Sequence, residues 1–179
     1  MATNTHGYVN TMKMACTNVD ALNAAGVASV DLDNGVLVTL TKMAQDSAFN
    51  ATGFEFEVAA AEATSKDVWL VATPEVGSTI AQQSLSDPRE FYNEAHRAMS
   101  IKHIVPDVDY VEMDANCFTD GTLPTNTNKY ATIGAGGKLT ATASAPSTAG
   151  VYFDFVANHS IAVGMNIVST VILRARVHA

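Results

Sequence analysis

Histidines and cysteines are the residues of this chain best suited to metal binding or nucleophilic chemistry, and it has 5 of the former and 2 of the latter. Zinc sites usually draw on close pairs such as His-x-x-x-His or Cys-x-x-Cys. His96 and His103 are seven residues apart, and on a strand two such residues face opposite sides. Cys16 and Cys117 lie far apart in sequence; we expect two free thiols, with a disulfide left open. The sequence therefore predicts no metal site and no cofactor.

A second group of polar residues, Asp114, Asn116 and Asp120, offers the oxygen ligands that calcium loops use. These residues lack the EF-hand pattern, and turns stabilised by Asp and Asn side chains explain them equally well. Cys117 lies among them, but no base and orienting group stand near it in sequence to activate a nucleophile. We therefore expect no catalytic residue and no enzymatic activity.

The chain is acidic and sparsely charged, with a formal net charge of −8 and charged residues making up 16% of its 179 positions. Nucleic-acid surfaces need clustered cations that displace counterions from phosphates, and no such cluster is present, so we expect no nucleic-acid partner. No stretch of the sequence approaches the roughly 18 apolar residues of a membrane span. The first residues, MATNTHGYVNTMK, lack the basic start and apolar run of a signal peptide. We therefore expect synthesis in a cytoplasm and no membrane partner.

Short segments with period-two alternation or a high content of β-branched and aromatic residues recur along the chain, and little of it has a helical period. The pattern predicts strands at 30–32, 36–41, 53–58, 67–73, 96–104, 108–113, 129–133, 138–144, 150–156 and 168–177. A turn or short helix is expected at 88–93, where an Asp-Pro pair could cap it. The many short strands indicate an all-β fold, an antiparallel β-sandwich or barrel-like domain.

Two glycine-containing turns define the predicted hairpins. Asn34-Gly35 is the preferred pair of a type I′ turn, so we expect 30–32 and 36–41 to pair. The run 134–137, Gly-Ala-Gly-Gly, separates two β-prone segments and lacks the GK[ST] ending of a phosphate loop. We expect a hairpin there, preceded by a long polar crossover over 119–128.

The chain divides into an extended N-terminal arm, residues 1–25, and one β-rich domain, residues 26–179. The arm is rich in Thr, Asn and Ala and has little periodicity, which is typical of a frayed terminus or of a segment that orders against a neighbouring subunit. No Gly/Ser-rich or charged linker separates the remainder into two halves. We therefore expect a single core over 26–179.

Two runs carry a resemblance to a known family: EFYNEAHRAMSIKHIVPDVDYVEMDANCF at 90–118 and KYATIGAGGKLTATASAP at 129–146. They resemble the capsid decoration proteins, also called cement or head-stabilising proteins, of tailed bacteriophages. The shared pattern is an F-x-N-E-A segment before a strand, then a stretch like Asp107–Val111, then a K-Y…G-K-L hairpin leading to Ala-Pro. The matching positions span about 87–146, a third of the chain. His96-Arg97 departs from the pattern, which has a glycine-containing turn there.

The resemblance implies a non-enzymatic virion protein that decorates the outer surface of the capsid and stabilises it by bridging capsomers. Its partners would then be the phage major capsid protein and other copies of itself, in a trimer, and its location would be the capsid surface. We expect its contacts to come from the arm and the crossover, which lack core periodicity. The residues predicted to bind the partner are Thr3, Tyr8, Met12, Asn18, Thr119 and Asn126.

Two alternative functions remain from the sequence. One is another virion component, such as the base of a head fibre, a tail-tube protein or a major capsid protein, although the last would need a long spine helix. The other is a carbohydrate-binding β-sandwich, whose sites use exposed Trp and Tyr with Asp and Asn. The single Trp69 lies in the middle of a predicted strand, where a core position is the simpler explanation.

Overall fold

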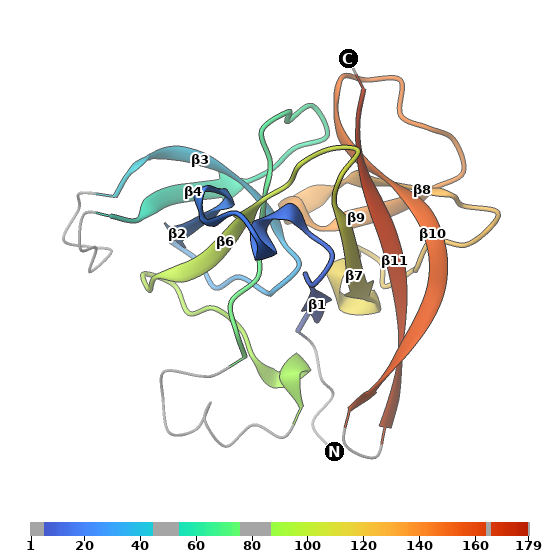
Figure 1. The fold of residues 1–179 in the computed structure, drawn as a ribbon, viewed down its shortest axis with the longest axis horizontal. Helices are drawn as coiled ribbons and strands as arrows, with labels where there is room; N and C mark the ends of the chain where they lie inside the picture. The colour runs from blue at the N-terminus through green and yellow to red at the C-terminus, as the bar shows by residue number, and fades with distance from the viewer. Residues whose placement is uncertain (1–5, 45–53, 76–86, 164–165, 179) are drawn as a thin grey trace.

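The computed structural model describes residues 6–44, 54–75, 87–163 and 166–178, and it confirms an all-β fold (Figure 1). The strands are β1 (Val9–Asn10), β2 (Asn23–Val27), β3 (Leu37–Met43), β4 (Phe56–Ala60), β5 (Trp69–Val71), β6 (Met99–His103), β7 (Tyr110–Asp114), β8 (Tyr130–Ile133), β9 (Leu139–Thr142), β10 (Gly150–Val163) and β11 (Asn166–His178). Single-turn 3₁₀ helices occur at η1 (Ala15–Thr17), η2 (Asp20–Leu22), η4 (Pro88–Glu90), η5 (Ala115–Cys117) and η6 (Ala135–Gly137). Two sheets share the described strands, and they lie side by side in Figure 1.

The first sheet is a small closed barrel with the strand order β2-β4-β3-β5-β6. All of its pairs are antiparallel except β2 with β4, which run parallel. Alternate side chains point inward because successive residues on a strand face opposite sides. Val38, Val71, Met99 and Ile101 are buried together in the barrel core, with Trp69 packed partly against them.

The second sheet has six strands in the order β1-β7-β11-β10-β8-β9. An isolated bridge between Phe118 and Leu139 brings the chain just past β7 against β9, so this sheet curls back toward its own edge. Its inner face holds the larger core, which includes the fully buried Phe153, Met113 and Leu173. Leu37 and Leu70 from the barrel belong to the same core, so the two sheets are packed together.

The predicted hairpin around Asn34-Gly35 is wrong. Leu32 pairs with Asn93 instead. A type I′ turn needs a positive φ at both central residues, but of this pair only Gly35 has one, of 89°. The buried Asn34 amide accepts from the Thr73 backbone N–H at 3.0 Å and donates to the Thr73 carbonyl at 2.8 Å. Asn34 therefore acts as a substitute strand partner for a residue far along the chain, which the local sequence pattern does not reveal.

The predicted hairpin at 134–137 is present, with β8 paired to β9 across η6. Gly136 and Gly137 have φ of 66° and 75°, the left-handed region that glycine adopts without a Cβ clash. A Cβ on Gly137 would lie 2.2 Å from the Leu37 carbonyl oxygen of β3. The tip of this hairpin is thus pressed against the barrel, and it helps to join the two sheets.

Residues 6–25, the described part of the predicted arm, lie against the rest of the chain. β1 pairs with β7, and the side chains of Val9, Met14 and Cys16 are buried in the larger core. The backbone N–H of Ala15 donates to a carboxylate oxygen of the buried Asp109 at 2.7 Å. β2 carries the chain from this segment directly into the barrel.

β10 and β11 continue well beyond the strands that flank them. β8 pairs with β10 only at 152–154, and β7 pairs with β11 only at 170–174, whereas the two long strands pair with each other from 150 to 163. A register shift between Phe155 and Ala157 marks a bulge, which increases the local twist. The outer part is a two-stranded ribbon that projects at the lower right of Figure 1, and it exposes Val156 and Ile167.

Candidate interaction surface

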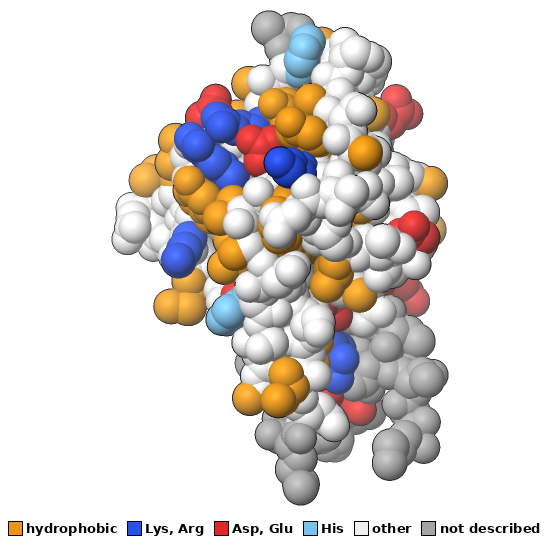
Figure 2. Space-filling model, turned by 90° about the vertical axis from the view of Figure 1, so that its right-hand side faces the viewer, with side chains coloured by type: hydrophobic (Ala, Val, Ile, Leu, Met, Phe, Trp, Pro, Cys, Tyr) orange, Lys and Arg blue, Asp and Glu red, His pale blue; other side chains and the backbone are white. Residues whose placement is uncertain are grey.

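The six-stranded sheet has one face against the core and one face turned away from it, which we call the outer sheet face. The cross-strand register places on this face the side chains of Tyr110, Glu112, Tyr152, Asp154, His159, Thr170, Ile172, Arg174 and Arg176. Figure 2 shows this side of the molecule: Lys and Arg side chains gather on its upper part, with acidic side chains between them and hydrophobic ones beside them. An open face of mixed chemistry of this kind is a candidate for partner binding.

A groove of about 290 Å³ opens on the outer sheet face where β1 ends. Its walls come from the β1 segment, β7 and β11, namely from Asn10, Met12, Lys13, Tyr110, Val111, Glu112 and Ile172. Met12 stands at its edge with 80% of its surface exposed. Methionine is flexible and polarisable and adapts to different apolar partners, so a Met beside an apolar groove suits a contact surface.

Asn10 fixes the backbone that carries Met12. The Asn10 amide oxygen accepts from the Met12 backbone N–H at 3.0 Å, and its amide nitrogen donates to Oε2 of Glu112 at 3.3 Å. Two residues after Met12, the Met14 backbone N–H donates to the Thr11 carbonyl at 3.0 Å and closes a turn. Met14 points into the core while Met12 stays outside, so the turn separates two methionines with different roles.

Glu112 is a mostly buried carboxylate at the floor of the groove. Its Oε1 atom accepts hydrogen bonds from His159 Nδ1 and from Thr170 Oγ1, each at 2.6 Å. Burial alone would raise the pKa of Glu112, but these hydrogen bonds and the charge of His159 outweigh it and lower the pKa below the usual value. The carboxylate is thus held ionised and is satisfied by groups of the chain itself.

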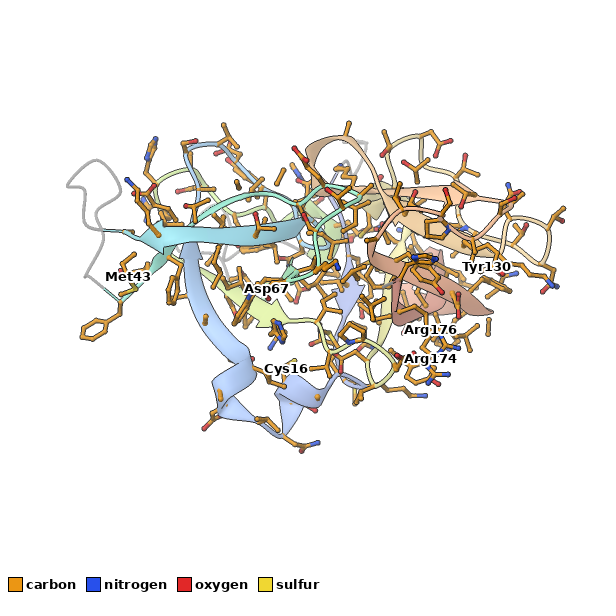
Figure 3. All side chains as sticks on the ribbon, turned by 90° about the horizontal axis from the view of Figure 1, so that it is seen from above. Cys16, Met43, Asp67, Tyr130, Arg174 and Arg176 are labelled. Carbon is orange, nitrogen blue, oxygen red and sulfur yellow. The ribbon has the colours of Figure 1, made fainter. Side chains whose placement is uncertain are left out.

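Two arginines of β11, Arg174 and Arg176, lie next to the groove, beyond its lining residue Tyr110. The Arg174 guanidinium lies over the Tyr110 ring, 5.7 Å from its centroid, and donates to the Asp107 carbonyl at 2.8 Å. Arg176 is paired with two carboxylates, Asp107 and Asp154, whose hydrogen bonds raise its pKa. Figure 3 shows Arg174 and Arg176 close together on the flank away from the barrel. Arg176 is therefore neutralised by its partners, whereas Arg174 has no carboxylate within ion-pair distance in the described part of the chain.

The predicted partner-binding residues fall on different surfaces. Thr3 lies outside the described residues, Met12 lies at the groove, Asn18 is exposed just after η1, and Thr119 and Asn126 are exposed on the crossover. Tyr8 is half-buried next to the core, where its backbone N–H donates to Asp114 at 3.0 Å. Thr119 lies beside β9, where its hydroxyl approaches the Leu139 carbonyl at 3.3 Å.

Of these residues, only Met12 lines the groove. Tyr110, Glu112 and Ile172, which also line it, were not predicted as contact residues. A signal for them existed in the alternation of 108–113 and 168–177, which identifies the face opposite the core. The alternation does not show where β1 ends, so it could not predict that this face stays open.

The described residues contain no group of three or more His, Cys, Asp or Glu side chains that could hold a metal ion. Cys117 is fully buried, and burial together with the neighbouring Asp114 raises the pKa of its thiol well above the usual range. A thiol that stays protonated is a poor nucleophile. Among the described helices, none is long and apolar enough to cross a membrane.

Comparison of the chain with protein-family models, with curated proteins and with solved structures found no match.

Proposed function

We propose that this chain is a non-enzymatic capsid decoration protein of a tailed phage, which binds the outer surface of the shell and bridges neighbouring capsomers. The observation that carries the proposal is the open outer sheet face with an apolar groove beside the exposed Met12. The resemblance of residues 87–146 to decoration proteins points to the same function. The bound form would be located on the virion, with the major capsid protein and other copies of this chain, in a trimer, as its partners.

A decoration protein binds by adding modest contacts to several subunits at once, because each further contact is then made at a high effective concentration. The molecule offers separate exposed places for such contacts: the groove, the crossover with Thr119 and Asn126, and the β10–β11 ribbon with Ile167. These places lie on different elements, which suits a protein that touches more than one neighbour.

The projecting ribbon also favours a second candidate, a virion component that assembles with copies of itself, such as a tail-tube or fibre-base protein. An isolated two-stranded ribbon is only marginally stable in water, and its unpaired edges can join a further strand. For a carbohydrate-binding protein the structure offers less support. Trp69 packs partly against the barrel core and meets His103 edge-on at 4.9 Å, so its ring is not an open platform for a sugar.

Co-sedimentation with phage shells that lack the protein tests the proposal, alongside light scattering of the protein alone. We expect saturable binding at a fixed ratio to the shell subunit. Polymers of the protein alone, without shell binding, would favour the tube or fibre component instead. A monomer that does not bind shells would refute both virion functions, and a glycan array would then test the carbohydrate alternative.

A further inference from the structure

We propose that the groove at Met12 receives a large apolar side chain from an acidic segment of a partner protein. The inference rests on the proposed function only for the identity of that partner, the major capsid protein. Two features of the groove determine the chemistry of its occupant: an apolar wall that can hold a side chain, and a positive rim that selects the residues beside it.

The apolar part consists of Met12, Ile172 and the ring of Tyr110. Met12 is 80% exposed, and Ile172 and Tyr110 are partly exposed although they lie on a sheet. The backbone under Met12 is held by Asn10, so the side chain can fold over an inserted group without a change of the main chain. A groove of about 290 Å³ has room for one large side chain.

The positive rim consists of Lys13, which lines the groove, and Arg174, which lies over the ring of the lining residue Tyr110. Most of the arginines, together with Lys42 and Lys138, pair with carboxylates. In the described part of the chain, neither Lys13 nor Arg174 lies within ion-pair distance of a carboxylate. Arg174 donates one hydrogen bond to the Asp107 carbonyl, and its buried Nε has no hydrogen-bond partner among the described atoms.

The one carboxylate among the lining residues, Glu112, offers no free oxygen to an incoming cation. Its two oxygens already receive hydrogen bonds from His159, Thr170 and Asn10. The chain as a whole carries a net charge of −8, so Lys13 and Arg174 give an acidic segment positive charge to meet on an otherwise acidic molecule. Charge complementarity therefore favours an acidic segment over a basic one at this groove.

The first experiment uses two peptides and NMR of the protein with labelled methionine methyl groups. One peptide has a phenylalanine between aspartates, and the other has lysines in place of the aspartates. We expect the acidic peptide to shift the Met12 methyl signal, assigned by its loss in Met12→Leu, and the basic peptide to leave it unchanged. Lys13→Glu should weaken the acidic peptide about fivefold or more, while Lys66→Glu, at an exposed lysine before β5, should not.

Equal shifts with both peptides, shifts confined to other methionines, or no shift at all would each overturn the inference. A second copy of the chain as the occupant would show itself as self-association that Lys13→Glu abolishes, and this too would overturn it. Shell binding by the same variants separates the two proposals. If shells bind wild type and Lys13→Glu equally, the groove inference fails and the decoration function stands; if the acidic peptide binds and shells do not, the reverse holds.

Discussion

Glu112 of β7 and His159 of β10 are joined by a 2.6 Å hydrogen bond although β11 runs between their strands. Thr170, on that middle strand, donates to the same carboxylate oxygen. The three side chains tie three neighbouring strands together at the level where the β10–β11 ribbon leaves the sheet. The base of the ribbon is therefore fixed by polar contacts on its outer side as well as by the core on its inner side.

This contact predicts a dependence of stability on acid. The pKa of Glu112 is lower in the folded chain than its unfolded value near 4.5, so the carboxylate contributes its full stabilisation above that value. The contribution is lost as the pH falls through the lowered folded pKa. We expect Glu112→Gln to lower the free energy of unfolding by about 1–3 kcal/mol at pH 7 and by less at pH 3. Urea unfolding at both pH values measures this.

Glu62→Gln is the matched control for this prediction because Glu62 is exposed and its replacement should change little at either pH. A Glu112→Gln deficit of the same size at pH 7 and pH 3 would show that the ionised carboxylate is not responsible.

Met12, inside the turn that begins at Thr11, and Met14, which closes it, should differ sharply. Met14 is 2% exposed in the larger core, so Met14→Ala should destabilise the chain by about 2–5 kcal/mol through lost burial and a cavity. Met12→Ala, at the 80% exposed position, should change stability by less than about 0.5 kcal/mol. Denaturant unfolding of both variants measures the difference. Similar small effects would mean that the N-terminal segment contributes little to the folded domain.

The glycines of the β8–β9 turn provide a second matched pair. Gly137→Ala places a Cβ against the Leu37 carbonyl in a left-handed conformation, so we expect it to destabilise by more than about 3 kcal/mol or to prevent folding. Gly136→Ala has a similar φ but open space around its Cβ, and should cost about 1 kcal/mol. Thermal unfolding distinguishes them, and equal losses would argue against close packing of the turn on β3.

Asn34 should be important for joining its loop to β5. Asn34→Ala removes both hydrogen bonds to the Thr73 backbone and the acceptor of the Asn93 amide, and leaves buried polar groups unpaired. We expect a loss of about 2–4 kcal/mol, against less than about 0.5 kcal/mol for Asn126→Ala on the exposed crossover. Chemical denaturation measures both; a loss of under 1 kcal/mol for Asn34→Ala would contradict the prediction.

The fold class could be predicted because alternation and turn chemistry are local. The strands at 108–113 and 168–177 and the hairpin at 134–137 each depend on residues that are close in sequence. Asn34 misled the prediction because its amide pairs with Thr73, which no local pattern connects to it. The ribbon beyond Val156 was missed because the bulge there shifts which residues face the core, and a single alternation pattern does not continue through it.

The candidate site was less predictable for a related reason. Met12 was predicted as a contact residue because its segment has no core periodicity. The groove beside it also needs Tyr110 and Ile172, which are far apart in sequence and are brought together by the sheet. Whether such a face is covered or open depends on how far β1 extends along β7. That length is set by the turn at Thr11 and by the burial of Met14, which are tertiary effects.

β11 runs for 13 residues in one nearly straight strand, a span of about 40 Å at the usual rise per residue. The β11 arrow begins in the lower part of Figure 1 and ends at the top. A fluorescent protein or an antigen fused after this strand would therefore sit at the pole opposite the ribbon. Such a fusion would leave the ribbon free to meet a neighbour.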